Sequence, residues 1–97
     1  MIKLTEATRE RLRRLFPQAQ WSAVEDLLRE QCGDNLPLVK ATSKDLVERV
    51  RFAVLKLSHG DMNQLQRHIK GARHDWRDVL MAAGFAHRLT AHKEWNP

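Results

Sequence analysis

Basic side chains in the last third of the chain recur at helical spacing, and they offer the clearest chemistry in the sequence. Positions 67, 70, 74 and 77 are separated by 3, 4 and 3 residues, which places them on one side of a helix. The candidates for contact with an anion or a nucleic acid are these four and a flanking arginine: Arg67, Lys70, Arg73, His74 and Arg77. Such a ridge can neutralise phosphates or lie in a major groove, although a charge run more often serves only as a solvated face.

The overall charge distribution agrees with a basic surface in the second half of the chain. The protein has 97 residues and a net charge of +5. Residues 1–48 carry eight Lys/Arg and eight Asp/Glu, whereas residues 49–97 carry nine and four, so the whole net charge lies in the second half. An asymmetry of this kind is typical of a surface for nucleic acid, an acidic protein or anionic lipid.

The sequence lacks the residue patterns that metal binding or catalysis would need. The five histidines are His59, His68, His74, His87 and His92, and no two of them have the i, i+4 spacing with an intervening Glu that a zinc-protease helix uses. Cys32 is the only cysteine and has no CxxC partner. Asp75 and Asp78 form a carboxylate pair, but helix capping explains both. We therefore predict no metal, no cofactor, no small-molecule substrate and no catalytic residue, so the protein is not expected to be an enzyme.

Helical periodicity and cap residues predict the elements that must position these side chains. Thr5, Ser43 and Asp61 are suited to helix N-caps, and Pro17 ends the first helix at the residue before it. Gly33 is expected to end the second helix in the left-handed conformation. The predicted fold is all-α, a small single-core bundle of four to five helices in one domain of residues 1–97, with helices at about 5–16, 18–32, 43–58, 61–71 and 75–83 and a further short turn in the tail.

Residues 61–83 admit two arrangements. The apolar seam Met62, Leu65, Ile69, Ala72, Trp76, Val79 and Ala83 runs at spacings of 3 and 4 and fits one continuous helix with Gly71 inside it. Alternatively, Gly71 ends one helix and Asp75 caps the next, with Asp78 in its first turn. The cap residues favour the break. The basic ridge is continuous only if the backbone keeps its helical phase.

The predicted helix at 43–58 is apolar on two sides, because Phe52 and Leu55 lie outside its main apolar stripe. A central position between two neighbours explains such a helix, and an interface with another chain is the alternative. We take as the leading hypothesis a non-enzymatic protein-interaction or regulatory module that binds a partner or itself through Phe52, Leu55 and Trp95. The alternative is a nucleic-acid-binding protein that uses residues 67–77.

The cellular compartment is expected to be the cytoplasm. The lone cysteine permits no internal disulfide, which suits a reducing compartment. No apolar run of signal-peptide or membrane-span length occurs near the start or elsewhere, so no membrane partner is predicted.

Overall fold

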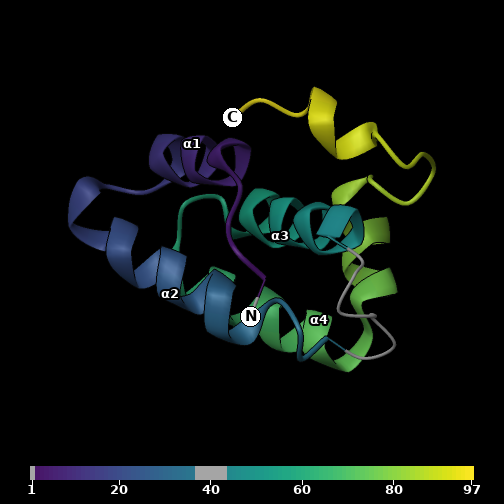
Figure 1. Ribbon diagram of the computed structural model, residues 1–97, viewed down its shortest axis with the longest axis horizontal. Helices are drawn as coiled ribbons and strands as arrows, with labels where there is room; N and C mark the ends of the chain where they lie inside the picture. The colour runs from purple at the N-terminus through teal and green to yellow at the C-terminus, as the bar shows by residue number, and fades with distance from the viewer. Residues whose placement is uncertain (1, 37–43) are drawn as a thin grey trace.

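Cap residues fix the ends of the first helix in the computed structural model, which describes residues 2–36 and 44–97 (Figure 1). α1 spans Glu6–Leu15, and the Thr5 side chain accepts a hydrogen bond from the backbone amide of Thr8 at 3.2 Å. Thr5 is therefore the N-cap, as predicted. Phe16 is extended, with φ −115° and ψ 147°, because the following Pro17 disfavours helical geometry there.

The second helix ends differently from the prediction. A 3-10 turn, η1 (Gln18–Gln20), leads into α2 (Trp21–Gln31). The prediction that Gly33 is left-handed was wrong. Among the described residues, the glycines with positive φ are Gly60 and Gly84. The chain leaves helical geometry already at Cys32, which has φ −136° and ψ 65°. Gly33 is instead a site of close approach. A Cβ there would lie 3.1 Å from Nη2 of Arg51.

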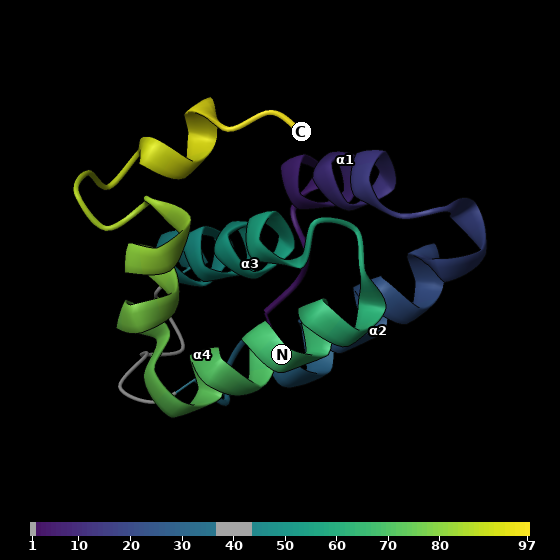
Figure 2. The same cartoon turned by 180° about the vertical axis from the view of Figure 1, so that it is seen from behind.

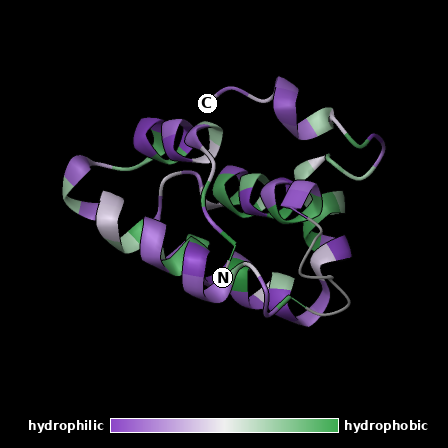
Figure 3. Cartoon of the chain, in the orientation of Figure 1, coloured by the Kyte–Doolittle hydropathy of each residue, from purple (hydrophilic) through white to green (hydrophobic). Residues whose placement is uncertain are grey.

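α3 (Lys44–Ser58) is the central helix, and most of its residues are buried. α4 packs along one side of it, and α1 and the C-terminal segment cover another (Figures 1 and 2). Apolar residues recur along α3 (Figure 3), and its buried apolar side chains belong to the hydrophobic core shared with these neighbours. This arrangement explains the two apolar sides, so the central-helix interpretation is confirmed. The predicted cap Ser43 lies outside the described residues.

α4 (Met62–Ala83) bends in its second half. Asp75 has non-helical backbone angles, φ −154° and ψ 99°, and the helix changes direction there (Figure 2). The predicted break at Gly71 was therefore wrong in position, because helical geometry continues through Gly71 as far as residue 74. Asp75 does cap the segment that follows, since its Oδ1 accepts a hydrogen bond from the Arg77 amide at 3.1 Å.

The caps and the seam of α4 agree with the sequence pattern. Asp61 accepts a hydrogen bond from the Gln64 amide at 2.9 Å, and Gly84 ends the helix in the left-handed conformation with φ 80°. The seam residues Leu65, Ile69, Ala72, Val79 and Ala83 are buried, and Met62 and Trp76 are half-buried against the core. The bend at Asp75 therefore redirects the helix without exposing its apolar side.

The chain after α4 folds back over α3 and α1 (Figures 1 and 2). It includes the 3-10 turn η2 (Ala91–Glu94), which is the short turn predicted for the tail. Cationic side chains hold the segment through backbone carbonyls. Arg49 Nε donates to Phe85 O at 3.0 Å, and Arg11 Nε donates to Trp95 O at 3.1 Å.

Every regular element among the described residues is a helix, so the predicted all-α bundle is confirmed. Within the same residues, none of the helices combines the length and the apolar character that crossing a bilayer requires.

Candidate functional site

The five basic-ridge candidates, Arg67, Lys70, Arg73, His74 and Arg77, are all exposed on α4. They point outward because the seam residues of the same helix face α2 and α3. The helical stretch from residue 62 to residue 74 contains three Lys/Arg and no Asp/Glu. The exposed surface of this stretch is therefore positively charged, because no acidic side chain within it offsets the charge of its Lys and Arg side chains.

The bend at Asp75 divides these candidates. Arg67, Lys70, Arg73 and His74 precede it, and Arg77 follows it on the redirected segment. Arg77 Nε also lies 3.2 Å from Oδ1 of Asp75. Hydrogen bonds from the Arg77 amide and side chain lower the pKa of Asp75, so this carboxylate stays charged and paired with Arg77. The condition for a ridge continuous to Arg77, an unbroken helical phase, is therefore not met. We call Arg67, Lys70, Arg73 and His74 the basic face.

His68 lies beside the basic face and adds little charge to it at neutral pH. Burial, the neighbouring Arg67 and then His59 lower the pKa of its imidazole. The positive charge of this helix therefore comes mainly from its arginines and its lysine.

A groove of about 290 Å³ runs between α2 and the basic face. Its residues are Leu27 and Gln31 of α2 and Gln66, Ile69, Lys70 and Arg73 of α4. Arg73 Nη1 donates to Gln31 Oε1 at 2.7 Å, so one residue of the basic face also bridges the two helices. Reasoning from the sequence missed this groove, because nothing in the local pattern says which turn of α2 meets which turn of α4.

The predicted protein interface does not form a surface. Phe52 and Leu55 are 1% and 0% exposed, so the interface interpretation was wrong for both residues. Trp95 is half-buried, and its ring lies 6.2 Å from that of Phe52, centroid to centroid. Two of the three proposed interface residues therefore contact each other within the chain. The helical periodicity correctly indicated an extra apolar side on α3. This side is covered by the C-terminal segment, whose Trp95 is 43 residues further along the chain than Phe52.

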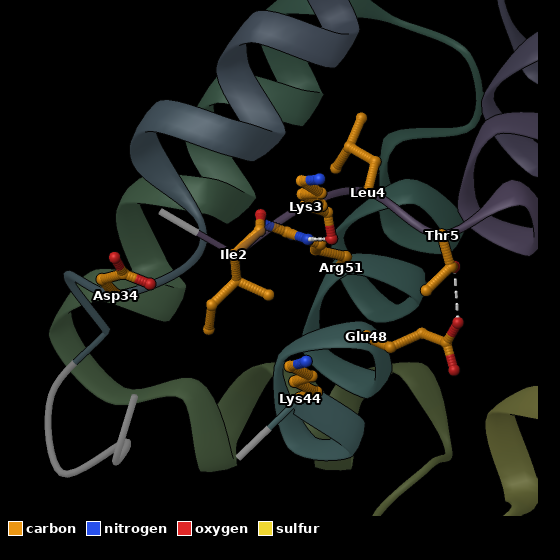
Figure 4. A pocket seen from close by; sticks show the side chains of 8 residues that line it. All are labelled: Ile2, Lys3, Leu4, Thr5, Asp34, Lys44, Glu48 and Arg51. Carbon is orange, nitrogen blue, oxygen red and sulfur yellow. Dashed lines mark hydrogen bonds between the residues drawn. The ribbon is translucent and has the colours of Figure 1, made fainter. Parts of the chain in front are cut away.

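A second hollow, of about 530 Å³, lies between the N-terminal segment and α3 (Figure 4). Three of its polar side chains, those of Arg51, Glu48 and Thr5, form hydrogen bonds within the chain. Arg51 donates to Cys32 O at 2.8 Å, Lys3 O at 3.0 Å and Ile2 O at 2.8 Å. The Glu48 carboxylate accepts from the Thr5 hydroxyl at 2.6 Å (Figure 4). These groups tie the N-terminal segment and α2 to α3, so the hollow is best explained as part of the framework.

Cys32 is placed where a thiol cannot act as a nucleophile. It is fully buried, and burial raises its pKa to about 12 in spite of the nearby positive charge of Arg51. The thiol is therefore protonated at neutral pH, and only the thiolate attacks electrophiles or binds metals.

The described histidines do not assemble into a metal site. No group of three or more His, Cys, Asp or Glu side chains in residues 2–36 and 44–97 lies close enough to hold an ion. His92 is the one buried histidine there, at 1% exposure, and neither ring nitrogen has a hydrogen-bond partner. Its Nε2 lies 3.5 Å from Oε2 of Glu48, which is long for a hydrogen bond. The imidazole packs between the rings of Phe52 and Phe85.

No protein-family model, curated protein or solved structure matches this chain.

Proposed function

We propose that the protein is a small non-enzymatic binding module that binds nucleic acid through the basic face of α4. The observation that carries this proposal is the exposure of Arg67, Lys70, Arg73 and His74 on a helical stretch that has no acidic residue. Lys and Arg side chains in such an array neutralise backbone phosphates and release their counterions, which is the main source of affinity in sequence-independent binding.

Two of the three residues that supported the competing hypothesis of a protein interface are not at the surface. Phe52 and Leu55 are in the core. The large apolar side chains that remain strongly exposed among the described residues are Met81, at 69%, and Leu89, at 81%. Large apolar side chains exposed singly are normal on protein surfaces. The positive charge of the basic face therefore supports a nucleic-acid partner more strongly than these exposed apolar side chains support a protein partner.

The non-enzymatic part of the proposal is supported by the state of the reactive groups. The Cys32 thiol is buried and protonated, and the Glu48 carboxylate is engaged by a structural hydroxyl. A cytoplasmic location, which the single cysteine favours, belongs to the same proposal.

A salt-graded binding assay with matched variants tests the proposed function. The probe is labelled DNA or RNA of mixed sequence, and the readout is fluorescence anisotropy. We expect affinity to fall with salt by a logarithmic slope of about 0.7 to 0.9 for each neutralised phosphate. The variant R67A/K70A/R73A should bind at least about tenfold more weakly. The control K3A/K44A/K93A loses the same charge from exposed positions outside α4 and should bind almost normally.

Two outcomes contradict the proposed function. One is the absence of binding by the unchanged protein at low salt. The other is an equal loss of affinity in both triple variants, which would assign binding to net charge instead of the basic face. Tighter binding of polyglutamate than of nucleic acid would instead indicate an acidic protein partner.

A further inference from the structure

The groove beside the basic face has two chemically different sides. Its α4 side carries the positive charges of Lys70 and Arg73. Its α2 side offers the apolar Leu27 and the amide of Gln31, and the neighbouring Glu30 is exposed and acidic. An occupant that matches this groove has negative charge along the α4 side and an apolar, hydrogen-bonding part that reaches toward α2.

We propose that the nucleic acid bound by this protein is single-stranded, with its phosphates along the basic face and an unstacked base in the groove between α2 and α4. This inference rests on the proposed function and specifies its ligand. A single strand has the required asymmetry, because its charged backbone lies on one side and its base edges are free on the other.

The charge of α2 argues against a duplex at the same site. A major groove is about 12 Å wide and admits one helix, so a phosphate backbone flanks that helix on each side. α4 packs directly against α2, whose residues Trp21–Gln31 include one arginine and three acids, Glu25, Asp26 and Glu30. Glu25 pairs with Arg9 of α1 at 3.3 Å and Asp26 pairs with Arg29, so the exposed Glu30 is the acid that a second backbone on that flank would meet. A single strand places no backbone there.

The groove also has a suitable size and suitable hydrogen-bonding groups. Its volume of about 290 Å³ equals that of about ten water molecules, which is enough for one base and part of its sugar. The half-buried Leu27 supplies most of the apolar surface for the base, because Ile69 is only 3% exposed, and the planar guanidinium of Arg73 can stack on the base. The amides of Gln31 and Gln66 each offer both donors and an acceptor.

The Arg73–Gln31 hydrogen bond orients one of these amides. Because Gln31 Oε1 accepts from Arg73 Nη1 at 2.7 Å, the Nε2 hydrogens of Gln31 are presented to other acceptors. Base carbonyl and ring-nitrogen atoms are acceptors of this kind. Arg73 thus contributes to both parts of the site, as a phosphate-facing cation and as the residue that orients Gln31.

The test compares one sequence in single-stranded and duplex form, on the unchanged protein and on Q31A/Q66A. We expect the single strand to bind about tenfold more tightly than the duplex, which corresponds to the contribution of one well-held base. The salt slope should be about 2, as expected for three phosphates of a single strand. Q31A/Q66A should lose the preference for the single strand and keep the salt slope, because its cations are intact. The control Q18A/Q20A removes two amides just before α2, outside the groove and α4, and should keep both properties.

The outcomes separate this inference from the proposed function. Equal or tighter binding of the duplex, with R67A/K70A/R73A still impaired, would overturn the single-strand inference and leave the proposed function standing. Failure of both probes to bind would overturn both proposals. An unchanged single-strand preference in Q31A/Q66A, with its fold verified by circular dichroism, would place the base outside this groove and overturn the inference.

Discussion

The Trp95 indole packs edge-on against the ring of Phe52, with the ring centroids 6.2 Å apart and the ring planes inclined at 62°. The guanidinium of Arg11 lies over the same Phe52 ring, 4.4 Å from its centroid, and also donates to the Trp95 carbonyl. One aromatic side chain of α3 thus joins α1 and the C-terminal segment. This contact closes the side of α3 that would otherwise be apolar and open to solvent.

Removal of the Phe52 ring should destabilise the monomer and leave its oligomeric state unchanged. Phe52→Ala is expected to lower the free energy of unfolding by about 3–5 kcal/mol, the usual cost of a large buried side chain. Trp95→Ala should cost less, about 2 kcal/mol, because the indole is half-buried. Chemical denaturation measures the stabilities, and light scattering over a concentration series measures association. Loss of self-association with unchanged stability in Phe52→Ala would restore the interface hypothesis and contradict the burial of Phe52 beneath Trp95 and Arg11.

Arg51 should be essential for holding the N-terminal segment. Arg51 is 1% exposed, and its guanidinium donates to three backbone carbonyls, those of Cys32, Lys3 and Ile2. Arg51→Met keeps the length of the side chain and leaves these acceptors without donors, so we expect a loss of about 3 kcal/mol. Limited proteolysis should cleave faster near residues 2–4, because the segment is no longer held against α3. The control Arg67→Lys, at an exposed position, should change stability by less than about 0.5 kcal/mol. Equal effects of the two changes would contradict the role given to Arg51.

The ends of the helices are determined mainly by residues close by in the sequence. The groove between α2 and α4 and the contacts of the C-terminal segment depend on residues that are far apart in the sequence. Thr5, Asp61 and Pro17 act within one helical turn, so their effects can be predicted from a short window of sequence. The burial of Phe52 depends on Trp95, 43 residues away, and α2 and α4 form the groove only after they pack. Arg49 and Arg51 resemble surface residues in the sequence. Their burial depends on backbone carbonyls at the ends of other segments, which no spacing rule identifies.

Stability should decrease in mild acid because of His92. Burial lowers the pKa of its imidazole more strongly than the adjacent Glu48 raises it, and Lys93 and Arg49 lower it further. The unfolded chain, in which histidine has a pKa of about 6.5, therefore binds this proton more readily than the folded chain does. The stability from neutral His92 is present above that value and is lost as the pH falls through the lower folded pKa.

A variant without the titrating group isolates this effect. His92→Phe keeps the aromatic packing, so its free energy of unfolding should fall less between neutral and mildly acidic pH than that of the unchanged protein. His68 has a lowered pKa for a similar reason and should leave a residual slope of the same sign. Parallel pH profiles for the two proteins would show that His92 does not titrate in this window.

Substitution of two glycines tests where the backbone requires glycine. Gly71 is exposed and helical, and a Cβ there would meet Cγ2 of Val79 at 3.8 Å, which is an ordinary contact. Gly71→Ala should therefore stabilise the protein by up to about 1 kcal/mol, since alanine is the better helix former. Gly60 has φ +79°, and a Cβ there would lie 2.4 Å from the Leu15 carbonyl oxygen. Gly60→Ala should destabilise by more than about 1 kcal/mol, because both the backbone angle and the contact are unfavourable. Thermal unfolding of both variants measures the contrast. Destabilisation by Gly71→Ala would mean that the helix breaks at Gly71 after all, which would move Arg73 and His74 out of phase with Arg67 and divide the basic face.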